Sequence, residues 1–190
     1  MLPAPLRRQR LPGQPGHEHG GLVAHHGGVG LDARVGEDRP HFTYVLVDCP
    51  PSLNLLTINA MCASHSVLVP LQCEFFALEG LSQLLSTVEQ VKRSLNNELS
   101  IHGIVLTMYD GRNNLSAQVV QDVRTNMGDA VYETIIPRNV RLAEAPSYGK
   151  PVIAFDRQSR GAQAYSALAQ ELLDRRDGVV RQYAEQGAEA

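Results

Sequence analysis

The sequence predicts an α/β fold in which a doubly wound, mostly parallel sheet is flanked by helices. From about residue 41 to about residue 175, short apolar runs alternate with longer amphipathic stretches, which is the pattern of strand and crossover helix. The apolar runs are nearly continuous, as expected of parallel strands that are covered on both faces. Hydrophobic residues make up 43% of the 190 residues, enough for one domain with a sizeable core.

Each predicted strand is an apolar run that ends at a polar or turn-forming residue. The first, Thr43–Val47 (TYVLV), stops at Asp48 and is expected to be a central strand buried on both faces. The later runs are Val67–Leu71, Ile101–Met108 and Tyr132–Ile136, followed by a short extended piece at Pro151–Phe155. Ligands of such sheets bind at the carboxyl ends of the strands, so the residues just after each run are the candidates for function.

The predicted helices are the stretches in which apolar residues recur three or four positions apart. The clearest is Leu78–Leu95, where Leu81, Leu84, Val88 and Val91 fall on one face. The other helices are expected at Leu53–Ala63, at Ala117–Met127 and from Gly161 to about Arg175. Strands that alternate with helices over more than 130 residues leave the doubly wound topology as the economical one.

Two carboxylates and two aromatic residues follow the second predicted strand. Glu74 and Glu79 flank Phe75 and Phe76 in this segment. We expect Glu79 to lie in the first turn of the helix, where the helix dipole favours a negative charge. The two phenylalanines are expected to pack against neighbouring elements, and neither carboxylate is a candidate for acid–base catalysis.

The two ends of the chain differ in composition from its middle. Residues 1–40 are rich in Gly, Pro, Arg and His without hydrophobic periodicity, so we expect them to be disordered, residues 41–176 to form the domain, and residues 177–190 to be a flexible tail. The first segment contains a group of residues that could bind a metal, although nothing ordered would fix its geometry. This group consists of His17, Glu18, His19, His25 and His26.

Composition also restricts the location and the partners of the chain. The net charge of −3 provides no general attraction to a polyanion, so any DNA binding must be local. No apolar run has the length of a signal peptide or of a membrane span, which predicts a cytoplasmic protein without a membrane partner. Cys49, Cys62 and Cys73 are odd in number and lack metal-ligand spacing, so we expect reduced and mostly buried thiols.

Asp48 is the strongest candidate site residue from local pattern alone. A carboxylate at the end of a buried strand can bind Mg²⁺ directly or through water beside a nucleotide phosphate, as in a Walker B motif. Many α/β proteins place an aspartate at the same position only to cap the next helix, and this alternative stays open from the motif alone.

Several blocks, in order, resemble the ParA and Soj partition ATPases, which are deviant Walker P-loop proteins. The blocks are VLVDCPPSLNLLTINAM, VLVPLQCEFFALEGLSQLL, IHGIVLTMYDGRNNL and IPRNVRLAEAPSYGKPV with DRQSRGAQAY, and they cover about Phe42 to Leu173. The resemblance implies a P-loop NTPase-like fold and an ATP- and Mg²⁺-dependent homodimer that binds nonspecific DNA at the nucleoid. It also implies a ParB-type centromere-binding partner. Septum-positioning MinD-type ATPases share the first block but resemble the PRNVRLAEAPS block less closely.

The resemblance assigns roles to particular residues. Asp48 matches the Walker B aspartate, and Pro137 with Arg138 matches the segment near the nucleotide base. Arg112 and Arg141 match positions where basic residues contact DNA phosphates in the family, which suits the planar, permanently charged guanidinium. Without the family, Arg112 reads as a solvated loop charge and Arg141 as an ion-pair partner of Glu144. The next candidates for DNA contact are Lys92, Arg93, Arg157 and Arg160.

The phosphate-binding loop of the family, which resembles KGGVGKT, does not occur in this sequence. Gly27-Gly28-Val29-Gly30 imitates its middle, but Leu31 and Asp32 stand where Lys and Thr are needed. A DPQGN block is also absent. The sequence therefore predicts an N-terminally truncated protein with an incomplete fold that lacks the first strands. We expect this protein to be inactive in ATP hydrolysis, and we interpret residues 1–40 as partly an out-of-frame translation. The alternatives are a non-catalytic DNA- or partner-binding module and a nonfunctional gene fragment, in which an exposed sheet edge causes aggregation.

Overall fold

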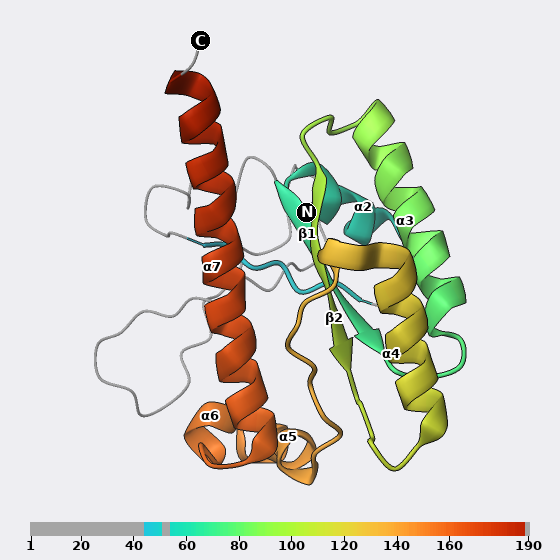
Figure 1. The fold of residues 1–190 in the computed structure, drawn as a ribbon, viewed down its shortest axis with the longest axis vertical. Helices are drawn as coiled ribbons and strands as arrows, with labels where there is room; N and C mark the ends of the chain where they lie inside the picture. The colour runs from blue at the N-terminus through green and yellow to red at the C-terminus, as the bar shows by residue number, and fades with distance from the viewer. Residues whose placement is uncertain (1–43, 51–53, 189–190) are drawn as a thin grey trace, which may run out of the picture. The chain divides into compact units, whose positions relative to one another are not determined.

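The computed structural model describes residues 44–50 and 54–188, with side chains as far as Arg175. Figure 1 shows the chain as a ribbon with its helices and strands, and the described residues divide into two compact units. One unit comprises those up to Val67 together with Leu84–Ser100, and the other comprises Leu68–Gln83 together with Ile101 onward. The two strands and the longest helices alternate along the chain in the order that the sequence predicts.

Two neighbouring strands, β1 (Ser66–Gln72) and β2 (Ser100–Thr107), form the sheet. Backbone hydrogen bonds show that they are parallel, because Ser100 N donates to His65 O while Cys73 N donates to Thr107 O. The centre of β2 is buried over Gly103–Leu106, as expected of a strand covered on both faces. The parallel sheet with helices around it confirms the predicted α/β class.

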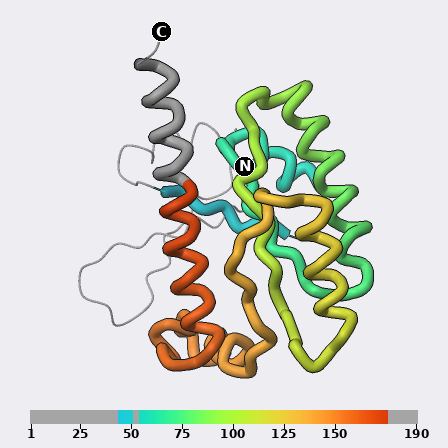
Figure 2. Tube along the Cα trace, viewed as in Figure 1, coloured from blue at the N-terminus to red at the C-terminus, as the bar shows by residue number. Residues whose placement is uncertain are grey.

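The strand predicted at Tyr132–Ile136 is only partly formed. This segment runs beside β2 in a parallel direction (Figure 2). Isolated bridges connect Val131 with Ile104 and Pro137 with Tyr109. Between the bridges, the amides of Glu133 and Thr134 donate to the carboxylate of Glu171 at 2.7 and 2.9 Å. A side chain thus accepts from two amides in the middle of the segment, and the segment hydrogen-bonds with β2 only near its two ends.

The strand predicted at Thr43–Val47 is also not formed as expected. Within the described residues 44–50, only Val47 makes a β-bridge, and the side chain of Leu46 is 75% exposed. The prediction of burial on both faces was therefore wrong for this segment. A nearly continuous apolar run is buried only where helices and neighbouring strands cover it, and local sequence does not determine that cover.

The main helices begin within a few residues of their predicted starts, but the last one extends well beyond its predicted end near Arg175. They are α2 (Leu55–Cys62), α3 (Ala77–Ser94), α4 (Asn114–Met127) and α7 (Arg160–Ala188). Two asparagines set the starts of α2 and α4: the side chain of Asn54 accepts from the amides of Leu56 and Thr57, and that of Asn113 accepts from Leu115 N. A short 3-10 turn, η2 (Gly128–Ala130), follows α4.

The segment between Pro137 and α7 is helical where an extended piece was predicted. It contains α5 (Val140–Glu144), η3 (Ala145–Tyr148) and α6 (Val152–Phe155). The apolar run of α6 therefore forms a helical turn, in which Asp156 N donates to Val152 O and the ring of Phe155 stacks on Tyr148 at 4.8 Å between centroids. A four-residue apolar run does not distinguish strand from helix, which explains the error.

The core of the second unit gathers β2, the 131–137 segment and α7. Val105, Tyr132, Ile136 and Leu168 form its buried cluster. Of the cysteines, Cys73 is buried and Cys62 is half-buried, whereas Cys49 is exposed, contrary to expectation, and all three are free thiols. Within the described part of the chain, no helix has the length and apolar character needed to cross a bilayer. The N-terminal segment and its histidines lie outside the described residues, while α7 continues as a helix to Ala188.

Candidate functional site

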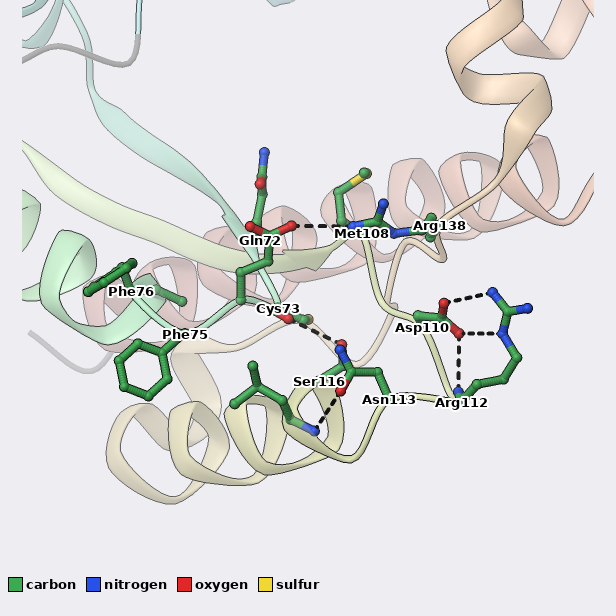
Figure 3. A pocket seen from close by; sticks show the side chains of 13 residues that line it. Gln72, Cys73, Phe75, Phe76, Met108, Asp110, Arg112, Asn113, Ser116 and Arg138 are labelled. Carbon is green, nitrogen blue, oxygen red and sulfur yellow. Dashed lines mark hydrogen bonds and ion pairs between the residues drawn. The ribbon is translucent and has the colours of Figure 1, made fainter.

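A pocket of about 820 Å³ lies in the second unit, where the chain leaves β1 and β2 (Figure 3). One wall is formed by the residues from Gln72, the last of β1, to Ala77. Another is formed by residues between Met108, just after β2, and the first turn of α4. Arg138 completes the lining. The pocket thus lies at the carboxyl ends of parallel strands, where the fold class predicts a ligand site.

The backbone turns sharply at Met108, directly after β2, where the chain begins to line the pocket. Met108 has a φ of 56°, the only described non-glycine residue with a positive value, and such a conformation is costly for a residue with a Cβ. Directly after it, Tyr109 N donates to Ile136 O at 3.2 Å and Tyr109 O accepts from Arg138 N at 2.8 Å. These two bonds hold Pro137 and Arg138 beside the end of β2, and of this pair, predicted to lie near a nucleotide base, Arg138 lines the pocket.

Asp110 and Arg112 form a closed ion pair at the edge of the pocket. Arg112 Nε donates to Asp110 Oδ1 at 3.0 Å, and Arg112 Nη2 donates to Oδ2 at 2.8 Å, as the dashed lines of Figure 3 show. The backbone amide of Arg112 also donates to Oδ1 at 3.1 Å. The side-chain hydrogen bonds from Arg112, followed by this amide, lower the pKa of Asp110 from 3.8 to about 2. The carboxylate is therefore ionised across the neutral pH range.

Arg138, the second cation of the pocket, is also paired. Its Nη2 lies 3.3 Å from Glu74 Oε1, which brings together two residues 64 positions apart in the sequence. Arg112 and Arg138 are the only cationic lining residues in the described part of the chain, and each has a carboxylate partner, Asp110 or Glu74, in the same lining. Formal charges in the lining therefore cancel.

This charge balance tests the fit of ATP and Mg²⁺, the cofactors that the family resemblance implies. The volume suits a nucleoside, and Arg138 with Met108 could border a base. A triphosphate carries several negative charges and needs an excess of cations or a cradle of backbone amides, whereas the two cations of the lining are matched by two carboxylates. The pocket formed by these residues does not fit the triphosphate by itself.

The remaining predicted site residues lie elsewhere. Asp48 is exposed and belongs to the other compact unit, so it is not part of this pocket lining. Arg141 lies in α5, where its Nη1 donates to Glu144 Oε2 at 2.9 Å and its Nε lies 3.3 Å from Asp156 Oδ2. The ion pair with Glu144 is the alternative to a DNA contact that was expected from the sequence. Its presence does not test a DNA contact, because exposed ion pairs of this kind are weak.

Sequence reasoning missed several features of the pocket. Phe75 and Phe76 are 72% and 73% exposed and contact each other edge to face at 5.2 Å between centroids, so the expectation that they pack against neighbouring elements was wrong. Asp110 was not singled out, although its place two residues before Arg112 in YDGR suggests an Asx turn. Glu79 lies in the first turn of α3, as predicted.

Comparison with known proteins identifies the family. A family model described as an AAA domain matches residues 29–101. Over 134 residues, or 70% of the chain, the sequence is 63% identical to the chromosome partitioning protein ParA of Caulobacter vibrioides strain NA1000 and covers 50% of it. It is 57% identical to the sporulation initiation inhibitor protein Soj of Bacillus subtilis strain 168 over 134 residues, 70% of this chain and 53% of Soj. The chain thus spans about half the length of these curated relatives.

Solved structures agree on the fold. Cobyrinic acid a,c-diamide synthase from Mycobacterium smegmatis superposes with a TM-score of 0.61 at 35% identity, covering 75% of this chain and 51% of that one. The cell division ATPase MinD of Pyrococcus furiosus superposes with a TM-score of 0.62 at 24% identity, over 76% of this chain and 57% of that one, which supports the P-loop NTPase-like fold alone. Over the matched 134 residues, the sequence identities of 63% and 57% place the chain in the ParA/Soj family of chromosome partitioning proteins.

Proposed function

We propose that this chain acts in the partition of chromosomal or plasmid DNA by binding DNA without sequence preference, and that it does not hydrolyse ATP by itself. The observation that carries the proposal is the 63% identity to a chromosome partitioning protein over 134 residues. The segments YDGRNN and RNVRL, which resemble the DNA-contacting blocks of the family, support the DNA-binding part of the proposal. A cytoplasmic, nucleoid-associated location follows from the same proposal.

The DNA contacts are assigned to Arg112 and Arg141. Both side chains reach solvent, 89% exposed for Arg112 and 53% for Arg141. Each projects from a turn or short helix, where a DNA backbone can approach without displacing a core element. Because the net charge of the chain is −3, such local contacts would supply the attraction that overall charge does not.

The absence of turnover rests on the phosphate-binding chemistry. No loop resembling KGGVGKT occurs in the 190 residues, so neither its amide cradle nor its lysines are present to bind the phosphates of ATP. The Mycobacterium smegmatis relative was solved with ADP and magnesium and with an ATP analogue and magnesium. In a complete family member, Asp48 would face Mg²⁺, and Pro137 with Arg138 would border the base. In such a protein ATP would hold two copies together as a homodimer, and a ParB-type protein would stimulate its ATP hydrolysis.

The test uses the purified 190-residue chain. We expect Mg-ATP hydrolysis no faster than a blank, together with binding to two unrelated duplexes of equal length with equal affinity. ATP turnover that Asp48→Ala abolishes would contradict the first part. A clear preference for one duplex, or no binding to either at about 50 mM salt, would contradict the second part.

A further inference from the structure

We propose that Asp110 is a positioning residue that holds the guanidinium of Arg112 in the orientation in which it binds a nucleic-acid phosphate. The inference rests on the proposed function, because it takes Arg112 as a DNA contact and adds how that contact is prepared. The chemistry recognised is a phosphodiester backbone, without readout of bases.

The hydrogen bonds between the two side chains use one edge of the guanidinium. Asp110 accepts from Nε and Nη2, which are the two donors on the side of the group. None of the described residues accepts from Nη1 of Arg112, and the side chain is 89% exposed. The end of the fork therefore points to solvent with its donors available, in the planar geometry that matches two phosphate oxygens.

Asp110 is itself held by the backbone around it. Its side chain is only 24% exposed, and its carboxylate also accepts from the amide of Arg112. Asn113 N donates to Asp110 O at 2.9 Å, which closes a tight turn between β2 and α4. On the other side, Tyr109 pairs with the 136–138 segment. A fixed carboxylate thus orients the long side chain of Arg112 before DNA binds. The entropy cost of ordering this side chain then does not weaken the binding step.

Two effects of opposite sign act on DNA affinity at Asp110. Its negative charge repels phosphate, so a purely electrostatic role predicts that removing the carboxylate strengthens binding. Its hydrogen bonds preorganise Arg112, so a positioning role predicts that removing the carboxylate weakens binding. A long arginine side chain loses much rotamer freedom when it is held in one orientation, whereas charges that face water interact weakly and are screened by salt. We therefore expect positioning to be the larger effect.

The experiment measures binding of the full chain to one duplex at about 50 mM and about 200 mM salt. The variants are Asp110→Ala, Arg112→Ala and the double variant. Glu133→Ala is the matched control. The side chain of Glu133 is 82% exposed and pairs with Arg124 at 2.9 Å, so this substitution also removes one paired surface carboxylate, away from Arg112. Thermal unfolding of each variant reports whether the fold persists.

We expect Arg112→Ala to weaken binding about tenfold and Asp110→Ala about three- to tenfold, while Glu133→Ala changes it by no more than about twofold. Because Asp110 acts through Arg112, Asp110→Ala should have no further effect in the Arg112→Ala background. Asp110→Asn retains one acceptor oxygen and should restore part of the affinity, whereas a role in charge alone would make it equal to Asp110→Ala.

The outcomes separate this inference from the proposed function. If Arg112→Ala weakens binding but Asp110→Ala strengthens it, or weakens it equally in the Arg112→Ala background, the positioning role is wrong and the DNA-binding function stands. If Arg112→Ala has no effect, or the unsubstituted chain binds no DNA, both are overturned. An unfolded Asp110→Ala variant leaves Asp110→Asn to decide: affinity equal to or above that of the unsubstituted chain overturns the positioning role.

Discussion

The hydroxyl of Tyr132 and Nδ1 of His102 lie 2.7 Å apart, and the Arg175 guanidinium covers the same tyrosine ring with its Cζ 4.1 Å from the ring centroid. Arg175 also donates to Val131 O at 2.7 Å and to Asp129 O at 3.0 Å. These contacts fasten α7 to β2 and to the segment beside it. The stability of this unit should therefore respond to changes at His102 and Tyr132.

The protein should become less stable as the pH decreases, because of His102. Burial, followed by the charge of Arg175, lowers the pKa of His102 below its usual 6.5. The unfolded chain then binds a proton at His102 more readily than the folded protein does, so the unfolding free energy decreases as the pH falls below about 6.5. Urea unfolding between pH 7 and pH 5 measures this slope. His102→Asn removes the titration and should make the slope shallower, and an unchanged slope would show that other groups cause it.

Gly103 should not tolerate a side chain. A Cβ at this position would lie 2.4 Å from Cε2 and 2.8 Å from Cδ2 of the buried Tyr132 ring. We expect Gly103→Ala to lower the unfolding free energy by about 1–3 kcal/mol through overpacking. Gly80→Ala is the matched control, because nothing lies within 4 Å of a Cβ there and alanine favours a helix over glycine by about 0.5–1 kcal/mol. Equal midpoints of thermal unfolding for the two variants would contradict this prediction.

Asn96 should stabilise the C-terminal end of α2. Its Nδ2 lies within hydrogen-bond distance of the carbonyl oxygens of Met61, Cys62 and Ser64, at 3.0, 3.2 and 2.8 Å. Asn96→Ala leaves these helix-end carbonyls without that donor, so we expect a loss of about 1–3 kcal/mol in chemical unfolding.

Asn126→Ala provides the comparison for Asn96. Its Nδ2 donates to Asp122 O one turn away within α4, at an exposed position where water can replace it. This variant should change the unfolding free energy by no more than about 0.5 kcal/mol. A larger loss from Asn126→Ala than from Asn96→Ala would show that the α2 end does not depend on this side chain.

The parts of the fold that the sequence predicted are those set by short-range pattern. The 3.6-residue period located α3 and α4, and the residues after β2 were placed at a strand end because apolar runs end where strands end. The irregular 131–137 segment was not predictable, because its amides bond to Glu171, which lies 37 and 38 positions away. The pairing of Arg138 with Glu74 across 64 positions likewise comes from topology. The family blocks named Arg138 but gave no sign of its partner.

The salt dependence of DNA binding should identify Arg112 and Arg141 as the phosphate contacts. Each contact with B-DNA contributes about 0.9 to the slope of log affinity against log salt, so replacing both arginines by alanine should flatten the slope by about 1.8. Lys92→Ala with Arg93→Ala removes the same number of charges from the last turn of α3 and should leave the slope unchanged. Titrations of the full chain at several salt concentrations between about 50 and about 200 mM measure both slopes. A flattening that follows the α3 pair, with the arginine pair unaffected, would move the DNA contact away from Arg112 and Arg141.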